Sequence, residues 1–196
     1  MNPFNPVSVA HRFVRSVIQS GDLCIDATVG NGHDTCFLCE LVGDKGHVLG
    51  FDVQSSALQS AQASLVDRRL EGRVTLLNQG HETLGIELAQ RALPDLKLVM
   101  FNLGYLPGSD KSVVTQTEST LEALNQSLDL LAPAGALSVI AYRGHEGGHD
   151  ESLAVELWVK DLPASSYFCA RYERWSKRRG LTPVFFWVRK LDNGIA

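Results

Sequence analysis

The chain has 196 residues, of which 44% are hydrophobic and 20% are charged, a balance that is typical of one folded globular domain and excludes a disordered chain. No apolar run approaches the roughly 18 residues that a membrane span needs, and residues 1–6 lack the apolar core of a signal peptide. The four cysteines are too few for a disulfide scaffold in a chain of this length. We therefore expect a soluble, cytoplasmic protein.

Short apolar runs alternate with segments of helical periodicity along most of the chain. An amphipathic helix is expected over Val9–Ile18, and the strands that follow are near-continuous apolar runs, which is typical of a sheet covered by helices on both faces. The predicted strands are Leu23–Ala27, His47–Phe51, Val74–Leu77, Leu96–Phe101 and Ala136–Ala141. Helices are predicted from near Thr35, from an N-cap at Ser55, over Thr117–Leu131 and over Asp150–Leu162.

The order of elements changes near the carboxyl end. Tyr167–Tyr172 and Val184–Lys190 are aromatic-rich strand candidates with no helix between them, so we expect them to pair as an antiparallel hairpin. Periodicity alone predicts an α/β fold with a mostly parallel sheet. Five strand–helix repeats followed by a hairpin also resemble the class I methyltransferase fold, a Rossmann-like, doubly wound, seven-stranded sheet with an antiparallel last strand.

No repeat, low-complexity tract or linker marks a domain boundary. We therefore expect one domain over residues 1–196. Within it, we expect an N-terminal helix in 1–20, a cofactor and catalytic part in 21–150 and a terminal β-hairpin in 165–190.

A glycine turn follows the first predicted strand, in the run from Asp26 to Thr35. Glycines let the backbone approach a ligand closely, and the N-terminus of the next helix offers unpaired N–H groups. A dinucleotide-binding fingerprint needs a small third residue where Thr35 stands, which disfavours a pyrophosphate. S-adenosylmethionine, which carries an ammonium, a carboxylate and a sulfonium, suits the acidic and amide side chains of this turn better.

Further polar residues follow the second and third predicted strands. Asp52 stands 22 residues after Gly30, where an acid accepts ribose hydroxyls. Gln54 and His81 are expected at the same edge of the sheet, although polar residues that satisfy their own loops are the alternative. The candidate cofactor-binding residues are Asp26, Thr28, Gly30, Asn31, Gly32, Asp34, Asp52, Gln54, His81 and Asn102.

The fourth predicted strand leads into Asn102-Leu103-Gly104-Tyr105, which resembles the Asn-Pro-Pro-Tyr tetrapeptide of amino-directed methyltransferases with both prolines replaced. An amine that attacks a sulfonium methyl group must point its lone pair along the breaking bond, and an amide oxygen can accept its N–H groups and aim it. Tyr105 can stack on a planar base. The candidate catalytic residues are Asn102, Tyr105, His145 and Asp110; the candidate proton acceptors are His145, Asp110 and His149.

We expect no metal site in this chain. Cys36 and Cys39 form a CxxC pair without a second Cys or His pair nearby, so they are expected to fill the core. His145 and His149 lie among glycines that give no rigid spacing of ligands.

Four motifs together resemble one bacterial family that was long labelled rRNA methylase. They are residues 26–35, Gly80-His81-Glu82, residues 101–108 followed by Asp110-Lys111, and residues 142–148. The resemblance extends over roughly residues 8–190. It implies an S-adenosylmethionine-dependent RNA methyltransferase, because members are associated with methylation of the 5-aminomethyl group of 2-thiouridine at the tRNA wobble position. The older label implies rRNA instead.

Basic residues concentrate in the predicted hairpin. Residues 171–190 carry seven basic side chains and one acid, a net charge of +6, whereas the whole chain carries −4. A surface that binds RNA phosphates and stacks bases has this composition, although a solvated hairpin tip is the alternative. The candidate RNA-binding residues are Arg171, Arg174, Trp175, Lys177, Arg178 and Arg179. A homodimer would present two such surfaces.

Several other functions stay open at this point. They are an rRNA methyltransferase, a small-molecule or protein N-methyltransferase, a non-catalytic RNA-binding protein with a relic cofactor loop, and an NAD-dependent oxidoreductase. The complete set of Asp26, Gly30, Gly32 and Asp52 disfavours the relic. Thr35 and the terminal hairpin disfavour the oxidoreductase.

Overall fold

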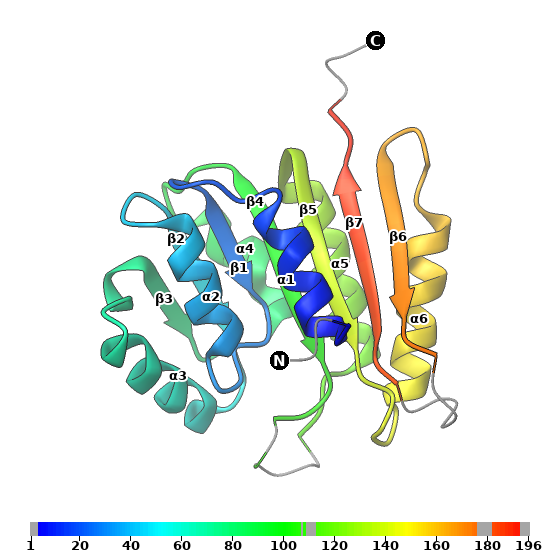
Figure 1. Ribbon diagram of the computed structural model, residues 1–196, viewed down its shortest axis with the longest axis horizontal. Helices are drawn as coiled ribbons and strands as arrows, with labels where there is room; N and C mark the ends of the chain where they lie inside the picture. Colours follow the sequence, from blue (N-terminus) through cyan, green and yellow to red (C-terminus); the bar gives the residue numbers. More distant parts are fainter. Residues whose placement is uncertain (1–3, 107, 109–112, 176–181, 193–196) are drawn as a thin grey trace.

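The computed structural model describes residues 4–106, 108, 113–175 and 182–192. A seven-stranded sheet in the order β3-β2-β1-β4-β5-β7-β6 forms its centre (Figure 1). The strands are β1 (Leu23–Asp26), β2 (His47–Phe51), β3 (Val74–Leu77), β4 (Leu96–Leu103), β5 (Leu131–Ala141), β6 (Tyr167–Glu173) and β7 (Val184–Lys190). The helices are α1 (Pro6–Arg15), α2 (His33–Val42), α3 (Ser55–Asp67), α4 (Leu84–Ala89), α5 (Thr117–Leu130) and α6 (Gly148–Asp161), with 3-10 turns η1 (Glu71–Arg73) and η2 (His81–Thr83).

The strand directions confirm the predicted fold class. β1 to β5 pair in parallel, and β7 pairs antiparallel with both β5 and β6. β6 therefore points the same way as the first five strands. Ala141 of β5 pairs with Val184, which pairs with Glu173 of β6, so these three residues lie level at one edge of the sheet.

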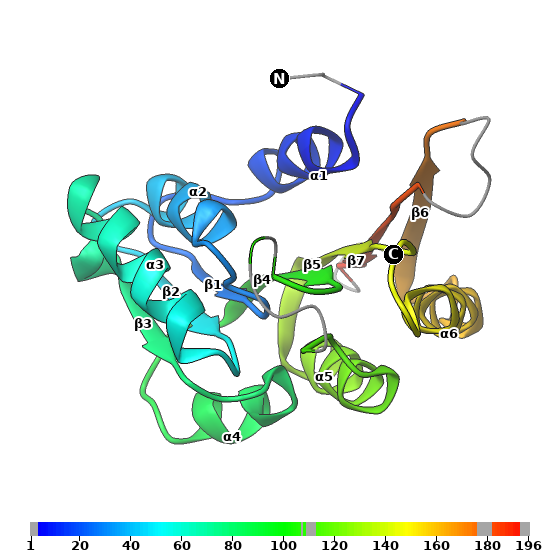
Figure 2. The same cartoon turned by 90° about the horizontal axis from the view of Figure 1, so that it is seen from below.

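Helices cover both faces of this sheet. α1, α2 and α3 lie on one face and α4, α5 and α6 on the other, as Figure 2 shows. Successive β4 residues alternate between the two layers: Leu98 and Met100 pack in the core on the α1–α2 side, and Val99 and Phe101 in the core on the α4–α6 side. Each such side chain contributes roughly 1.5–3 kcal/mol to folding. Two-sided burial is the reason that the strands read as continuous apolar runs.

Several element ends differ from the prediction. α1 begins at Pro6, three residues earlier than expected, because the side chain of Asn5 caps it by accepting a hydrogen bond from the N–H of Val7 (3.2 Å). α3 is capped at Gln54 rather than at Ser55. β4 extends to Leu103, so Asn102 lies within the strand and not in the loop after it.

The junction of α5 and β5 also differs. α5 ends at Leu130 and β5 begins at the next residue, so Pro133 lies inside the strand instead of before it. The pairing of β4 with β5 shifts register between Leu96 and Leu98, a bulge that accommodates a residue without an N–H donor. Among the described residues, no helix is long and apolar enough to cross a bilayer.

Candidate active site

The carboxyl ends of the parallel strands bring the predicted polar residues to one edge, the lower edge of the sheet in Figure 1. Asp26 ends β1, Asp52 follows β2, and Asn102 is the last but one residue of β4. His81 follows β3 and His145 follows β5. Ligands of open α/β sheets bind at this edge, where the strand order reverses between β1 and β4.

Hydrogen bonds to Asp52, which follows β2, and to the backbone of β4 hold the glycine turn that follows β1. The carboxylate of Asp52 accepts hydrogen bonds from the N–H groups of Gly30 and Gln54, both at 2.8 Å. The Thr28 hydroxyl accepts a hydrogen bond from the N–H of Asn102 (2.7 Å). Asp26, Asp52 and Asn102 thus converge on one turn, and the partly exposed Asp52 and Asn102 still have oxygen lone pairs to offer a ligand.

A side chain at position 32 would clash with α3, so glycine is the residue that fits there. Its φ is +79°, and a Cβ atom there would lie 2.7 Å from the Cα of Ala61 in α3. Gly32 is also the N-cap of α2, where no side chain caps the helix. The first N–H groups of α2 therefore face the turn, as in anion sites at helix N-termini.

Asp26 is the most deeply buried carboxyl of this edge. It accepts hydrogen bonds from the N–H of Thr28 (3.2 Å) and from the hydroxyl of Thr35 (2.6 Å). Burial, the largest cause, and the nearby charge of Asp34 raise the pKa of Asp26 from 3.8 to about 7, although both hydrogen bonds act to lower it. This group therefore titrates near neutral pH.

Asn102 is fixed through its side chain as well as its backbone. Its Nδ2 donates to Asp34 Oδ2 (2.7 Å), and the other oxygen of Asp34 is 2.6 Å from Nε2 of His11 in α1. Asp34 thus links the N-terminal helix to the residue that the sequence places at the methyl-transfer position. His11 was not among the predicted site residues, because nothing in the local sequence pairs α1 with α2.

His81 places an unsatisfied nitrogen at the same edge. Its side chain is 7% exposed, and Nδ1 lies 3.2 Å from the carbonyl of Ala27. Burial lowers the pKa of His81, which favours the neutral ring with Nδ1–H donating to that carbonyl. Nε2 is then a buried acceptor with no partner among the described residues.

Two of the predicted catalytic side chains touch each other beyond β4 and β5. The rings of Tyr105 and His145 meet edge to face with centroids 5.8 Å apart. Nδ1 of His145 lies 2.9 Å from the carbonyl of Glu146, while Nε2 is buried without a partner in the described part of the chain. Tyr142 was not predicted as a site residue. Burial and the charge of Asp34 raise the pKa of its hydroxyl, which therefore senses the charge of the same carboxylate that binds Asn102.

The remaining predicted residues fall into three groups. Asn31 and Gln54 are partly exposed in the turns after β1 and β2, and His149 is exposed in the first turn of α6. Cys36 and Cys39 are buried in the core, as expected. Asp110, Lys177, Arg178 and Arg179 lie outside the described residues.

Glu151 was not predicted but is 3% exposed. Its carboxylate accepts hydrogen bonds from the hydroxyls of Thr115 (2.6 Å) and Thr120 (2.8 Å). The N–H of Thr115 in turn donates to the carbonyl of Gly104 (3.0 Å). Glu151 therefore fastens the chain that returns from the loop after β4.

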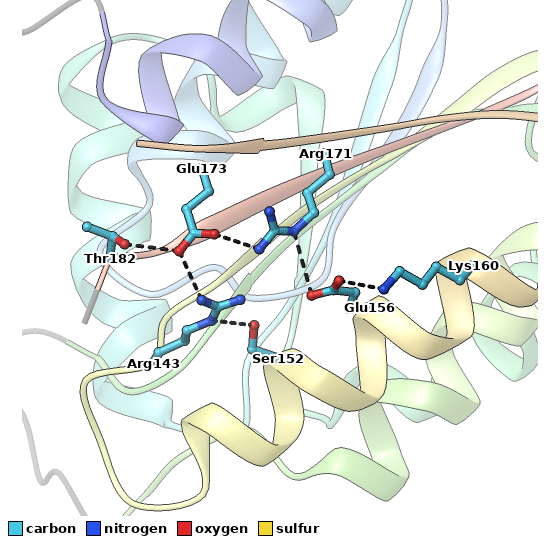
Figure 3. A network of polar contacts seen from close by, with 7 residues as sticks. All are labelled: Arg143, Ser152, Glu156, Lys160, Arg171, Glu173 and Thr182. Carbon is cyan, nitrogen blue, oxygen red and sulfur yellow. Dashed lines mark hydrogen bonds and ion pairs between the residues drawn. The ribbon is translucent and has the colours of Figure 1, made fainter. Parts of the chain in front are cut away.

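A polar network connects the hairpin to the loop after β5. Glu173 is its centre, because its carboxylate contacts Arg143 (3.0 Å), Arg171 (2.6 Å) and the hydroxyl of Thr182 (3.2 Å). Arg171 also lies 3.6 Å from Glu156 of α6. Figure 3 shows the full set: Arg143, Ser152, Glu156, Lys160, Arg171, Glu173 and Thr182.

The turn end and the open end of the hairpin lie at opposite edges of the sheet, so Arg174 does not share one surface with Arg189 and Lys190. Arg174 and the 94% exposed Trp175 follow Glu173 at the edge that carries the site. Arg189 and Lys190 lie about 20 Å away along β7. Lys190 Nζ donates to the carbonyls of Leu128 and Leu131 at the end of α5 (3.2 and 2.8 Å).

Residues 48–188 match the model of the family described as "Putative rRNA methylase". The chain belongs to this family. A relative from Arabidopsis thaliana, a chloroplastic tRNA (mnm(5)s(2)U34)-methyltransferase, is 37% identical over 94% of this chain and 69% of its own length. The ribosomal RNA small subunit methyltransferase H of Streptococcus equi is 30% identical over 53% of this chain but only 33% of its own length.

Two solved structures of methyltransferases are similar to this protein over most of its chain. A putative rRNA methylase from Clostridium thermocellum is 34% identical with a TM-score of 0.88, and covers 95% of this chain and 98% of its own. SMU.1697c from Streptococcus mutans, a putative methyltransferase in complex with SAH, is 32% identical with a TM-score of 0.84 over the same shares. This methylase is an S-adenosylmethionine-dependent methyltransferase.

The charges and hydrogen-bonding groups of the site are complementary to those of S-adenosylmethionine. The uncapped N-terminus of α2 suits a carboxylate, and Asp34, whose side chain is 12% exposed, suits an ammonium or a sulfonium, whereas Asp26 is fully buried beneath the turn. The buried Nε2 of His81 lacks a hydrogen-bond donor among the described residues, and a ligand amino or hydroxyl group would supply one.

Proposed function

We propose that this methylase transfers a methyl group to the amine nitrogen of 5-aminomethyl-2-thiouridine at the wobble position of tRNA. The name of the Arabidopsis relative and the extent of its similarity support this substrate. The observation that carries the proposal is the position of Asn102 at the carboxyl end of β4, with the touching rings of Tyr105 and His145 in the loops after β4 and β5. Together they supply an amide, an aromatic ring and an imidazole whose Nε2 has no partner among the described residues. An amine attached to a planar base can be oriented by the amide, packed against the ring and deprotonated by the imidazole.

Each of these side chains has a separate role in the proposal. When bound, S-adenosylmethionine supplies a methyl group activated by a sulfonium. Oδ1 of Asn102 accepts a hydrogen bond from the amine and so orients the nitrogen lone pair toward the methyl group. Such orientation lowers much of the activation barrier of a bimolecular transfer. Tyr105 packs against the base.

The amine must also lose a proton, because an alkylammonium of pKa near that of lysine (about 10.4) has no lone pair at neutral pH. Among the candidates His145, Asp110 and His149, we favour His145. Its Nδ1 faces the carbonyl of Glu146 and therefore carries the hydrogen, so Nε2 is the basic nitrogen. Cofactor-binding roles are proposed for the residues around the glycine turn, with Asp52 for the ribose hydroxyls.

The hairpin tip is proposed to bind the RNA. Arg174 and Trp175, together with Lys177, Arg178 and Arg179, would contact phosphates and stack on bases. Arg171 was expected to contact RNA as well, but two carboxylates already hold its guanidinium. We therefore propose that Arg171 supports the tip.

Three further features belong to the proposal. The chain acts as a single methyltransferase domain, and it forms a homodimer whose two tips together cover an anticodon stem, which light scattering would test. We also propose a cytoplasmic location. All four cysteines are free thiols, as in proteins of reducing compartments.

The second candidate substrate is ribosomal RNA, which the family description and the Streptococcus equi relative favour. Transfer assays with labelled cofactor would compare two acceptors: tRNA from a strain that lacks the modification, and ribosomes from the same strain. We expect label in tRNA alone, and mass spectrometry of its nucleosides should show the wobble base heavier by one methylene. Label in ribosomes alone would replace the tRNA proposal by the rRNA one.

A further inference from the structure

Three side chains from three separate elements form one hydrogen-bonded row that ends at the site. His11 of α1 contacts Asp34 of α2 through Nε2 (2.6 Å), and Asp34 accepts Nδ2 of Asn102 in β4 (2.7 Å). The side chains of His11 and Asp34 are 23% and 12% exposed. The row is therefore largely shielded from water, where charge-assisted hydrogen bonds are strong.

The chemistry of Asp34 fixes the direction of every hydrogen in this row. An ionised carboxylate only accepts hydrogen bonds, so His11 must present a protonated Nε2 and Asn102 must present its NH2 group. The amide of Asn102 is then oriented with Oδ1 on the side away from Asp34. That orientation supplies an acceptor for an amine, whereas the flipped amide would offer a donor and repel its N–H groups.

Helix packing holds His11 in place. Its ring stacks on that of Phe37 in α2, with centroids 3.8 Å apart and planes 6° apart. α1 itself is anchored by Val9, Ala10 and Val14, which are buried in the core beside β7. The imidazole is thus fixed by groups that take no part in the site.

We propose that His11 is a positioning residue that sets the amide orientation of Asn102 through Asp34, an inference that rests on the role of Asn102 in the proposed function. Without His11, Asp34 loses one of its two side-chain partners and is free to rotate. The Asn102 amide then samples both orientations, and only one of them accepts the amine.

Kinetics of His11→Ala and His11→Gln provide the first test, because the Nε2 of glutamine can take the place of the Nε2–H of histidine. We expect His11→Ala to lower kcat about 10- to 100-fold, with little change in KM for tRNA or in the Kd of S-adenosylhomocysteine. His11→Gln should recover most of kcat. Loss of kcat in both variants would mean that His11 acts by a proton and not by its hydrogen bond, and would overturn the proposal.

A matched control comes from the opposite edge of the sheet. His47, the first residue of β2, also makes one side-chain hydrogen bond through Nε2, to the hydroxyl of Thr75 (2.9 Å). His47→Ala therefore removes the same ring and the same kind of bond far from the site. Its kcat should equal that of the unchanged protein; a loss as large as that of His11→Ala would mean that both act through general destabilisation.

The second test needs no RNA, so it separates this inference from the choice of substrate. NMR of the side-chain amide of Asn102, assigned with Asn102→Ala, reports its hydrogen exchange in the free protein. We expect slow exchange in the unchanged protein and in His11→Gln, and exchange at least about tenfold faster in His11→Ala. Equal exchange in all three would overturn the positioning role, even if the protein methylates tRNA. If instead no tRNA is methylated while exchange responds as expected, the proposed substrate fails and the inference stands.

Discussion

Asp26 shows how one buried carboxyl can make the stability of this methylase depend on pH. Its pKa is raised to about 7 by burial and then by the charge of Asp34. The folded state therefore holds this proton more tightly than the unfolded chain does. Protonation stabilises the fold, and that stabilisation is lost as pH rises from the unfolded pKa through the folded one.

A comparison with Asp26→Asn isolates this effect, because the other titrating groups are common to both proteins. Between about pH 5.5 and about pH 8, we expect the free energy of unfolding of the original protein to fall by about 2 kcal/mol relative to the variant. Chemical denaturation at several pH values, without cofactor, measures the difference. A constant difference across this range would mean that Asp26 is ionised throughout.

Some residues of the site could be predicted from the sequence, and others could not. Asp26, Asp52 and Asn102 could be placed together from the sequence because each follows or ends an apolar run, and parallel strands bring their ends to one edge. The positions of His11 and Tyr142 in the site could not be predicted in this way. His11 reaches Asp34 only because α1 and α2 pack on the same face of the sheet, a contact that depends on the complete fold.

At the scale of whole elements, the approach of α2 to α3 depends on Gly32. This residue was predicted to let a ligand approach the backbone. The atom nearest to its missing side chain belongs instead to Ala61 of α3, and its φ of +79° is unfavourable for any other residue. Gly32 thus serves helix packing at least as much as cofactor binding.

Gly32→Ala should therefore destabilise the fold itself. The left-handed φ and the clash with the backbone of α3 together cost about 2–4 kcal/mol. A melting experiment without cofactor should show Tm lower by about 5–15 °C. Gly72→Ala is the matched control, because no atom lies within 4 Å of its added Cβ, and it should leave Tm nearly unchanged. A normal Tm for Gly32→Ala would assign Gly32 to ligand approach alone.

The strands were predicted more accurately than the helix ends. His47–Phe51, Val74–Leu77 and Val184–Lys190 match the structure, because burial on both faces leaves a continuous apolar run. The helix ends were less accurate, since they depend on single hydrogen bonds: Asn5 starts α1 early, and the carboxylate of Asp52 holds the N–H of Gln54 where Ser55 was expected to cap α3.

At the scale of the molecule, the register of the last three strands places Arg174 and Trp175 at the edge of the sheet that carries the candidate site. The sequence showed the charge of this segment but not that its two ends lie at opposite sheet edges. Arg174 and Arg189 belong to one hairpin, yet only Arg174 lies at the edge of the sheet where β4 and β5 have their carboxyl ends. This difference gives a direct test of where RNA docks.

We expect Arg174→Ala to weaken tRNA binding and to reduce the slope of log K against log salt by about 1, as for the loss of one phosphate contact. Arg189→Ala should change neither quantity. Filter binding over a range of salt concentrations, with S-adenosylhomocysteine present, measures both. Equal effects of the two substitutions would indicate a diffuse electrostatic contribution without a defined docking site.

The pairing of Glu173 with Val184 has a consequence for how RNA preference can diverge in this family. The sheet constrains both residues, and Glu173 is tied to Arg143, whereas the pairing of β6 with β7 ends at Glu173 and Val184. We therefore expect the chain between these two residues to tolerate changes of length and sequence between homologues. On the RNA contact proposed above, a chimera that carries this segment of a ribosomal homologue should bind a different RNA while its methyl-transfer chemistry stays the same.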